Sequence, residues 1–79
     1  MSIIRSIVFT NTAASQYKKI KDSKLQNRIC SALEYIARDP FIGKPLQAEF
    51  KGCYSHRIGD YRIIYNLSSE TVGVILIDH

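Results

Sequence analysis

The chain has 79 residues, of which 46% are hydrophobic and 23% are charged. A chain of this length hides only about 60% of the surface that it exposes when unfolded, so residues 1–79 have room for one small domain. No long polar tract marks it as disordered, and no apolar run approaches the ~20 residues that a membrane span needs. We therefore expect a globular cytoplasmic protein without a membrane segment.

The net charge and the cysteine content indicate which kinds of partner and site to expect. Eleven basic residues against seven acidic ones give a net charge of +4, which favours an anionic partner. We interpret the lysines between residues 18 and 24 as part of the solvent-exposed face of helices. Cys30 and Cys53 lie far apart and show no Cys/His spacing typical of zinc sites. We expect two free, largely buried thiols and neither metal nor cofactor.

The start of the chain predicts a strand that runs into a helix. Residues 2–9 (SIIRSIVF) are rich in β-branched side chains, and residues 10–12 (TNT) are of the types that cap helices. Between residues 12 and 22, Ala13, Tyr17 and Ile20 recur at helical spacing with polar residues between them. This segment is predicted to be a short amphipathic helix.

A second helix is predicted to begin at Ser23. Ser23 and Gln26 fit a capping box, in which each side chain satisfies a backbone N–H of the other. The helix should end at Asp39, because a residue that precedes proline avoids helical angles. Its apolar positions recur at steps of three and four residues: Leu25, Ile29, Leu33 and Ile36.

The second half of the chain predicts a sheet. Residues 40–50 (PFIGKPLQAEF) read as a connector, and residues 52–58, 61–67 and 72–77 read as strands. The last strand, VGVILI, is apolar on both faces, so we expect it to be central and parallel to the first. The predicted fold is α+β with the order β-α-α-β-β-β: two antiparallel helices packed on one face of a small, mostly antiparallel four-stranded sheet.

The second and third of these strands are predicted to form a hairpin. Gly59-Asp60 matches a two-residue loop with glycine at its first central position, where a positive φ is needed. If Ile58 pairs with Tyr61 across this turn, Arg57 lies opposite Arg62. The further pairs would be His56 with Ile63, Ser55 with Ile64 and Tyr54 with Tyr65.

This register places both arginines on the same exposed face. Side chains alternate between faces, so Arg57 and Arg62 share theirs with Ser55, Ile64 and Asn66, while the more apolar set faces the helices. Like charges directly opposite on a sheet destabilise it by up to about 1 kcal/mol. A phosphate between them would reverse this effect, because guanidinium groups bind phosphate oxygens bidentately.

Plainer interpretations compete with a phosphate site. Asp60 or Glu49 could neutralise one of the arginines, which would leave ordinary exposed side chains. His56 faces the helices, which favours a hydrogen-bonded, partly buried histidine over a catalyst. We interpret the tyrosines of the hairpin as side chains of the core or of its edge, with hydroxyls that reach solvent, in preference to base-stacking residues: Tyr54, Tyr61 and Tyr65.

The run KGCYSHRIGDYRIIY, with IVFT near the start, the DP and GKPL of the connector and a final strand ending in His79, resembles the RelE/ParE superfamily of toxins from toxin-antitoxin pairs. The likeness covers essentially the whole chain. Its most specific part is GDYRIIY with an arginine two positions before the glycine.

The resemblance implies a toxin whose RelE-like branch cleaves mRNA in the ribosomal A site, without a metal, and blocks translation. A cognate antitoxin would hold it inactive. The 2′-hydroxyl of the RNA attacks the adjacent phosphate while basic side chains orient the RNA and stabilise the transition state. By position the implied catalytic residues are Arg62, Arg57 and His79, and the implied RNA-binding residues are Lys44, Lys51 and Ser55.

Two departures from the RelE-like pattern predict either a chain that lacks the C-terminal catalytic tail or a weak or inactive member. Ser55 stands where some RNA-cleaving members carry a lysine, and the arginine and tyrosine that follow the histidine in active members have no counterpart after His79. Two alternatives therefore stay open: a ParE-like inhibitor that docks on DNA gyrase through the sheet, and a non-catalytic module whose main partner is an antitoxin peptide.

Overall fold

The computed structural model describes residues 4–79, so the first two residues of the predicted opening strand, Ser2 and Ile3, lie outside them. The helices are α1 (Asn11–Lys19) and α2 (Ser23–Arg38), and short 3-10 turns span Pro40–Ile42 and Ala48–Phe50. The strands are β1 (Ser6–Phe9), β2 (Lys44–Pro45), β3 (Cys53–Ile58), β4 (Tyr61–Leu67) and β5 (Thr71–Asp78).

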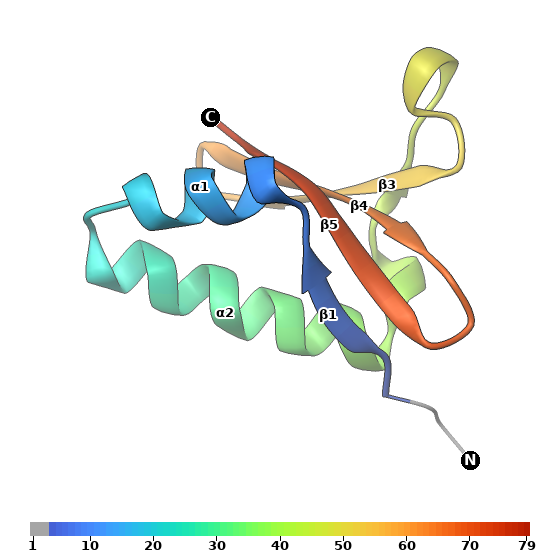
Figure 1. Cartoon of the computed structure of the whole chain (residues 1–79), viewed down its shortest axis with the longest axis horizontal. Coiled ribbons are helices and arrows are strands. Elements are labelled where there is room, and N and C mark those ends of the chain that lie inside the picture. The colour runs from blue at the N-terminus through green and yellow to red at the C-terminus, as the bar shows by residue number, and fades with distance from the viewer. Residues whose placement is uncertain (1–3) are drawn as a thin grey trace.

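These elements form the predicted α+β fold, with two helices that run in opposite directions on one side of a mixed sheet (Figure 1). The strand order is β1-β5-β4-β3-β2, and within the described residues only β1 and β5 pair in parallel. The parallel pairing of the first and last strands was predicted, although β4 and not β5 holds the middle position. The prediction of four strands was wrong, because the connector adds a fifth.

The fifth strand, β2, is only two residues long and lies at the edge of the sheet. It pairs Lys44 with Ser55 and Pro45 with Tyr54. Proline has no N–H to donate and is confined to such edges in a sheet. Pro45 therefore marks the connector as a loop in the sequence while still permitting it to pair on one side.

The helix starts differ from the sequence prediction in one respect. Thr10 caps α1 by accepting from the N–H of Ala13 at 3.1 Å. The cap of α2 is Asp22, whose carboxylate accepts from the N–H groups of Lys24 and Leu25. The predicted capping box is therefore wrong: a carboxylate one residue upstream takes the cap, where the helix dipole also favours negative charge.

The amide of Gln26, freed from any capping role, ties the two helices together. It donates to the carbonyls of Tyr17 and Ile20, at 3.2 and 2.8 Å. Both carbonyls lie at the end of α1, where helix carbonyls lack regular partners, and that of Tyr17 also accepts from the N–H of Ile20. Gln26 thus supplies hydrogen bonds that fix the angle between the helices.

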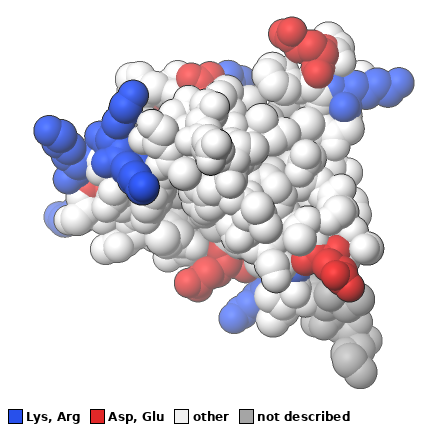
Figure 2. Space-filling model, in the orientation of Figure 1, with Lys and Arg blue, Asp and Glu red and all other residues white. Residues whose placement is uncertain are grey.

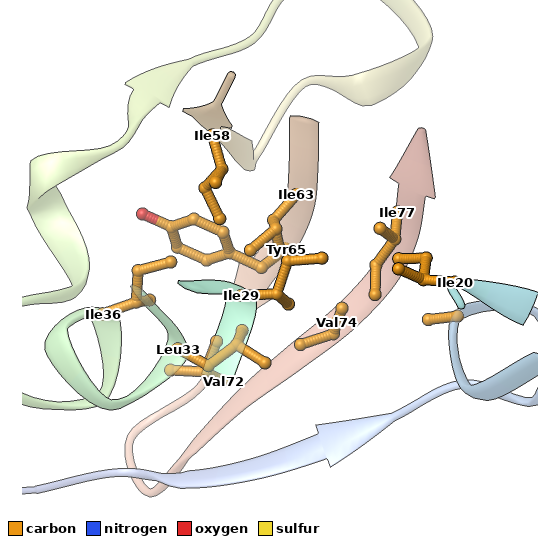
Figure 3. Close-up of a cluster of buried hydrophobic side chains, with 11 residues drawn as sticks. Ile20, Ile29, Leu33, Ile36, Ile58, Ile63, Tyr65, Val72, Val74 and Ile77 are labelled. Carbon is orange, nitrogen blue, oxygen red and sulfur yellow. The ribbon is translucent and has the colours of Figure 1, made fainter. Parts of the chain in front are cut away.

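The core lies between the helices and the inner face of the sheet, the face that the helices cover (Figure 3). The apolar helix positions predicted from the spacing are buried or packed against this core. The largest fully buried side chains come from α2 and from the two longest strands, β4 and β5: Tyr65, Ile29, Ile36, Ile63, Val72 and Val74.

Tyr65 links this core to the connector. Its hydroxyl donates to the carbonyl of Pro40 at 2.7 Å and accepts from the N–H of Gly43 at 3.1 Å. A Cβ at position 43 would collide with the Tyr65 hydroxyl, so the close approach requires glycine there. The expectation that this hydroxyl reaches solvent was wrong, because the connector folds over it.

Within residues 4–79, no helix is long and apolar enough to cross a membrane. The same part of the chain shows no group of three His, Cys, Asp or Glu side chains that could hold a metal ion.

Candidate phosphate-binding site on the outer face of the sheet

The β3–β4 hairpin has the predicted register. Gly59 has a φ of +56°, as the first position of its turn requires, and Ile58 pairs with Tyr61. Arg57 therefore lies directly opposite Arg62. Both side chains point to the outer face, the side of the sheet that the helices leave uncovered, and both are exposed.

Each arginine makes one hydrogen bond that orients its side chain. Arg57 donates from Nε to the carbonyl of Gly59 at 3.2 Å. Arg62 donates from Nη2 to Oδ2 of Asp78 at 3.1 Å, in an ion pair whose side chains are 49% and 43% exposed. The remaining guanidinium N–H groups of both residues are left to bind a ligand.

The acidic neighbour was predicted incorrectly. In the described part of the chain, neither Asp60 nor Glu49 pairs with an arginine, and the partner is Asp78 on β5. Counted from the β4–β5 turn, where Leu67 pairs with Val72, a regular hairpin would place Arg62 opposite Ile77. A bulge between Ile64 and Tyr65 shifts this register by one residue and brings Asp78 alongside.

Three charges thus lie in one row across the sheet: Arg57, Arg62 and Asp78, which we call the arginine row. Two positive charges and one negative charge leave one net positive charge. Because exposed ion pairs stabilise a fold by only about 0–1 kcal/mol, the pair with Asp78 contributes little to folding. The row remains a cationic surface with oriented donors.

Two of the predicted RNA-binding residues lie in the next row. Lys44 on β2 pairs with Ser55 on β3, two residues from Arg57 and therefore about 7 Å away along the strand. Lys44 is exposed and Ser55 half-buried. The third member of that row, Ile64, is only 3% exposed although it shares the outer face, so the expectation of an open face fails at its centre.

The structure does not bring the other two predicted residues to the arginine row. Lys51 follows the Ala48–Phe50 turn, in the segment that extends from the sheet in Figure 1, six residues before Arg57 and outside β3. The ring of His79 packs edge-on against Tyr61, with centroids 5.0 Å apart. Tyr61 belongs to the helix-facing set, so this contact turns the imidazole away from the arginines.

A second surface feature is an apolar groove of about 450 Å³ between α1, α2 and the edge strand β1. Its walls include Ile7, Phe9 and Leu33, and Lys18 and Glu34 also line it. Lys18 and Lys19 occupy the last turn of α1, and Figure 2 shows basic side chains gathered where the two helices join. The groove therefore has apolar walls beside a basic end.

Cys30 lines the same groove and is exposed, so the expectation of two buried thiols was wrong for this residue; Cys53 is half-buried, and both are free. The Cys30 thiol lies 3.0 Å from the Tyr17 hydroxyl. This hydrogen bond, with partial burial, raises the pKa of Tyr17 above its ordinary value. The helical spacing of apolar residues placed Cys30 next to the buried Ile29. It could not show that the Cys30 side chain lines a groove and is exposed.

Comparison with known proteins assigns the class. The family model described as "ParE toxin of type II toxin-antitoxin system" matches residues 7–79. The chain therefore belongs to the RelE/ParE superfamily of toxins.

Individual relatives narrow the type. Toxin RelG of Mycobacterium tuberculosis is 34% identical over 77 residues, covering 94% of this chain and 88% of that toxin. Toxin YoeB of Synechocystis is 37% identical over 76 residues, covering 87% of this chain and 88% of that toxin. The chain is thus a toxin of a type II toxin-antitoxin system, of the RelE/YoeB type.

Solved structures agree with this assignment. A chain in the toxin-antitoxin complex RelBE2 of Mycobacterium tuberculosis superposes with a TM-score of 0.84 at 31% identity, covering 98% of this chain and 99% of that one. A chain in the YoeB-YefM complex of Staphylococcus aureus also gives 0.84, at 20% identity and with 95% of each chain covered. The second likeness concerns the fold alone.

Proposed function

We propose that the protein is a ribosome-dependent endoribonuclease that cleaves mRNA in the A site and so blocks translation. The observation that carries this proposal is the arginine row: two guanidinium groups directly opposite each other, exposed, and each held by a single contact. Folding gains nothing from this arrangement, because like charges opposite on a sheet repel. A phosphate bound between them would turn the repulsion into attraction.

The chemistry fits a metal-independent phosphoryl transfer. The 2′-hydroxyl of the RNA attacks the adjacent phosphorus, its proton leaves, the bond to the 5′-oxygen breaks, and that oxygen takes up a proton. Arg57 and Arg62 would bind the non-bridging oxygens and stabilise the extra negative charge of the transition state. Lys44 and Ser55 would hold the neighbouring phosphate, and Lys51 a more distant one.

His79 is the proposed proton-transfer residue. Its position directly after Asp78 brings it within one residue of the arginine row, but its ring lies against Tyr61. To reach RNA bound at the row, the imidazole has to leave this contact. The proposal therefore expects that RNA binding changes the environment of the His79 ring, which NMR of the imidazole protons would detect.

The test is a substitution that removes the phosphate contact without touching the core. Arg62→Ala should abolish growth arrest on induction in a bacterial host and leave reporter transcripts uncut. Arg38→Ala is the matched control, because Arg38 is an exposed arginine in the last turn of α2 and not on a strand. Equal transcript cleavage by the Arg62→Ala protein would refute the proposal.

A ParE-like activity is the second candidate, favoured by the description of the matching family model. In that case the outer face would dock on DNA gyrase, and the arginines would contact protein. The decisive experiment is DNA supercoiling by purified gyrase. Inhibition by micromolar wild-type protein, with transcripts left intact, would replace the first proposal by the second.

We also propose a cognate antitoxin as the partner, supported by the complexes in which similar toxin chains were solved. The groove between α1, α2 and β1 suits an acidic-leaning amphipathic segment, because its apolar walls lie beside exposed lysines. Leu33 belongs to the core, so Leu33→Ala would also disturb the fold, and an exposed residue at the edge of the groove is the better target. Lys18→Glu should weaken antitoxin binding at least tenfold, whereas Lys44→Glu should not. Should Lys18→Glu leave the affinity unchanged, the antitoxin does not use this groove.

A further inference from the structure

The contact between Arg62 and Asp78 has a geometry that suggests a role beyond holding one side chain. Only Nη2 of Arg62 and Oδ2 of Asp78 are joined, at 3.1 Å, so the contact is single and not a bidentate fork. Arg62 keeps Nε and Nη1 free for a ligand. The carboxylate is 43% exposed and lies beside the place where a phosphate would bind.

We propose that Asp78 is a specificity-determining residue, which selects the phosphodiester groups within an RNA chain against phosphate monoesters. This inference rests on the proposed function, because it concerns the same phosphate site. A phosphodiester carries one negative charge, which the single net positive charge of the arginine row neutralises. A monoester carries close to two at neutral and higher pH, and it would leave the occupied site with a net negative charge.

The selectivity follows from how repulsion scales with ligand charge. Coulomb energy is proportional to the product of the charges, so Asp78 repels a dianion twice as strongly as a monoanion at the same position. Binding constants depend exponentially on energy, so the penalty factor for a dianion is about the square of that for a monoanion. If Asp78 weakens diester binding about threefold, it should weaken monoester binding about tenfold.

Such selection would matter because free nucleotides and RNA ends also present phosphates. Two unopposed arginines would bind these more highly charged groups in preference to the internal linkages of a message. The position of Asp78 lowers that preference while leaving the hydrogen-bonding donors of Arg57 and Arg62 in place. No such selection would be needed for a surface that only docks on protein.

The experiment measures the binding of two small probes to the purified full chain. Dimethyl phosphate is a monoanion, and methyl phosphate is a dianion at pH 8. NMR titrations that follow the arginine Nε–H signals would give both dissociation constants. Asp78→Asn should tighten methyl phosphate binding about tenfold and dimethyl phosphate binding about threefold, and Asp78→Ser, a second neutral variant, should behave alike.

Two controls separate a local effect from a change in net charge. Glu70→Gln makes the same change at an exposed residue just before the start of β5, at the other end of that strand, and should leave both constants unchanged. Asp78→Glu keeps the charge and should keep the wild-type ratio of the two constants. Equal gains for both probes in Asp78→Asn, or the same gains in Glu70→Gln, would overturn the inference.

Failure of the underlying proposal would look different. If neither probe shifts the Arg57 or Arg62 signals of the wild-type protein, the phosphate site itself is wrong, and with it both this inference and the proposed function. If both probes bind at the row, Arg62→Ala removes the binding and Asp78→Asn leaves the ratio unchanged, only the role of Asp78 is refuted.

Discussion

The two faces of the β3–β4 hairpin use the same strands for different ends. On the inner face, Ile63 and Tyr65 are fully buried under the helices. On the outer face, Arg57 and Arg62 face each other in solvent. Neighbours in sequence, Arg62 and Ile63, therefore lie in opposite environments, because side chains alternate along a strand.

The contrast separates the residues that stabilise the fold, on the inner face, from the two arginines on the outer face, which do not. Removing an inner-face side chain leaves a cavity, whereas removing an outer-face arginine relieves a repulsion and loses at most one exposed contact. A pair of charges that folding does not require points to a ligand. If this division is right, substitutions on the inner face should lower stability far more than those on the outer face.

The largest effect is expected from Ile63→Ala. Ile63 is fully buried in the core, so its truncation should lower the free energy of unfolding by about 2–5 kcal/mol. Urea denaturation would measure the change. Its neighbour provides the contrast: Arg62→Ala should cost less than about 1 kcal/mol, since it removes only an exposed ion pair. Similar losses in the two variants would contradict the division between the faces.

Tyr65→Phe should lower the free energy of unfolding by about 1–3 kcal/mol, because the N–H of Gly43 and the carbonyl of Pro40 lose a buried partner. Tyr61→Phe is the control, since its hydroxyl bonds to no group in the described residues.

The buried hydroxyl of Tyr65 should also make the stability of the fold depend on pH in the alkaline range. Burial raises the pKa of Tyr65 above its ordinary value of 10.0. The unfolded chain then releases this proton first, so the contribution of the hydroxyl to stability is present below about pH 10 and is lost as the pH rises further. The raised pKa of Tyr17 acts in the same direction. Denaturation between pH 9 and 11 should show a shallower decline for Tyr65→Phe, and an unchanged decline would argue against the buried bond.

A smaller effect tests the start of α2. Asp22→Ala should lower the free energy of unfolding by about 0.5–2 kcal/mol, because two backbone N–H groups lose their cap. Ser23→Ala should change it by less than about 0.5 kcal/mol, because position 23 already lies inside the helix. The reverse order in thermal denaturation would restore the capping box that the sequence suggested.

The smallest effect is expected on the outer face, and its sign is opposite. Arg57→Ala should leave stability unchanged or raise it by up to about 1 kcal/mol, because the repulsion with Arg62 is removed. The gain should shrink in high salt, which screens exposed charges. A clear loss of stability would show that the fold needs the pair after all.

Local patterns in the sequence were sufficient for most of the fold. The Gly-Asp turn set the register of β3 and β4, and helical spacing identified Ile29, Leu33 and Ile36 as core positions. These features depend on residues close together in the chain, where turn chemistry and periodicity are decisive. The sequence did not predict the edge strand β2, because one of its two residues is a proline and neither belongs to an alternating strand pattern.

The site could be predicted only as far as those local rules reach. Arg57 and Arg62 were placed correctly. The position of Asp78 beside Arg62 depends on a bulge between β4 and β5 that no residue type in the sequence indicates. The edge-on contact of His79 with Tyr61 likewise depends on how the strand ends pack in three dimensions. Long-range geometry, and not residue chemistry, set this limit.

The most direct test of the phosphate site is cleavage of a defined mRNA by purified protein on programmed ribosomes. The account predicts cleavage by the wild-type chain and, for a folded Arg62→Ala variant, a rate lower by about 10²–10³-fold, the loss typical of one preorganised donor to a charged transition state. Arg38→Ala should cleave at the wild-type rate. Cleavage by Arg62→Ala at that rate would contradict the account.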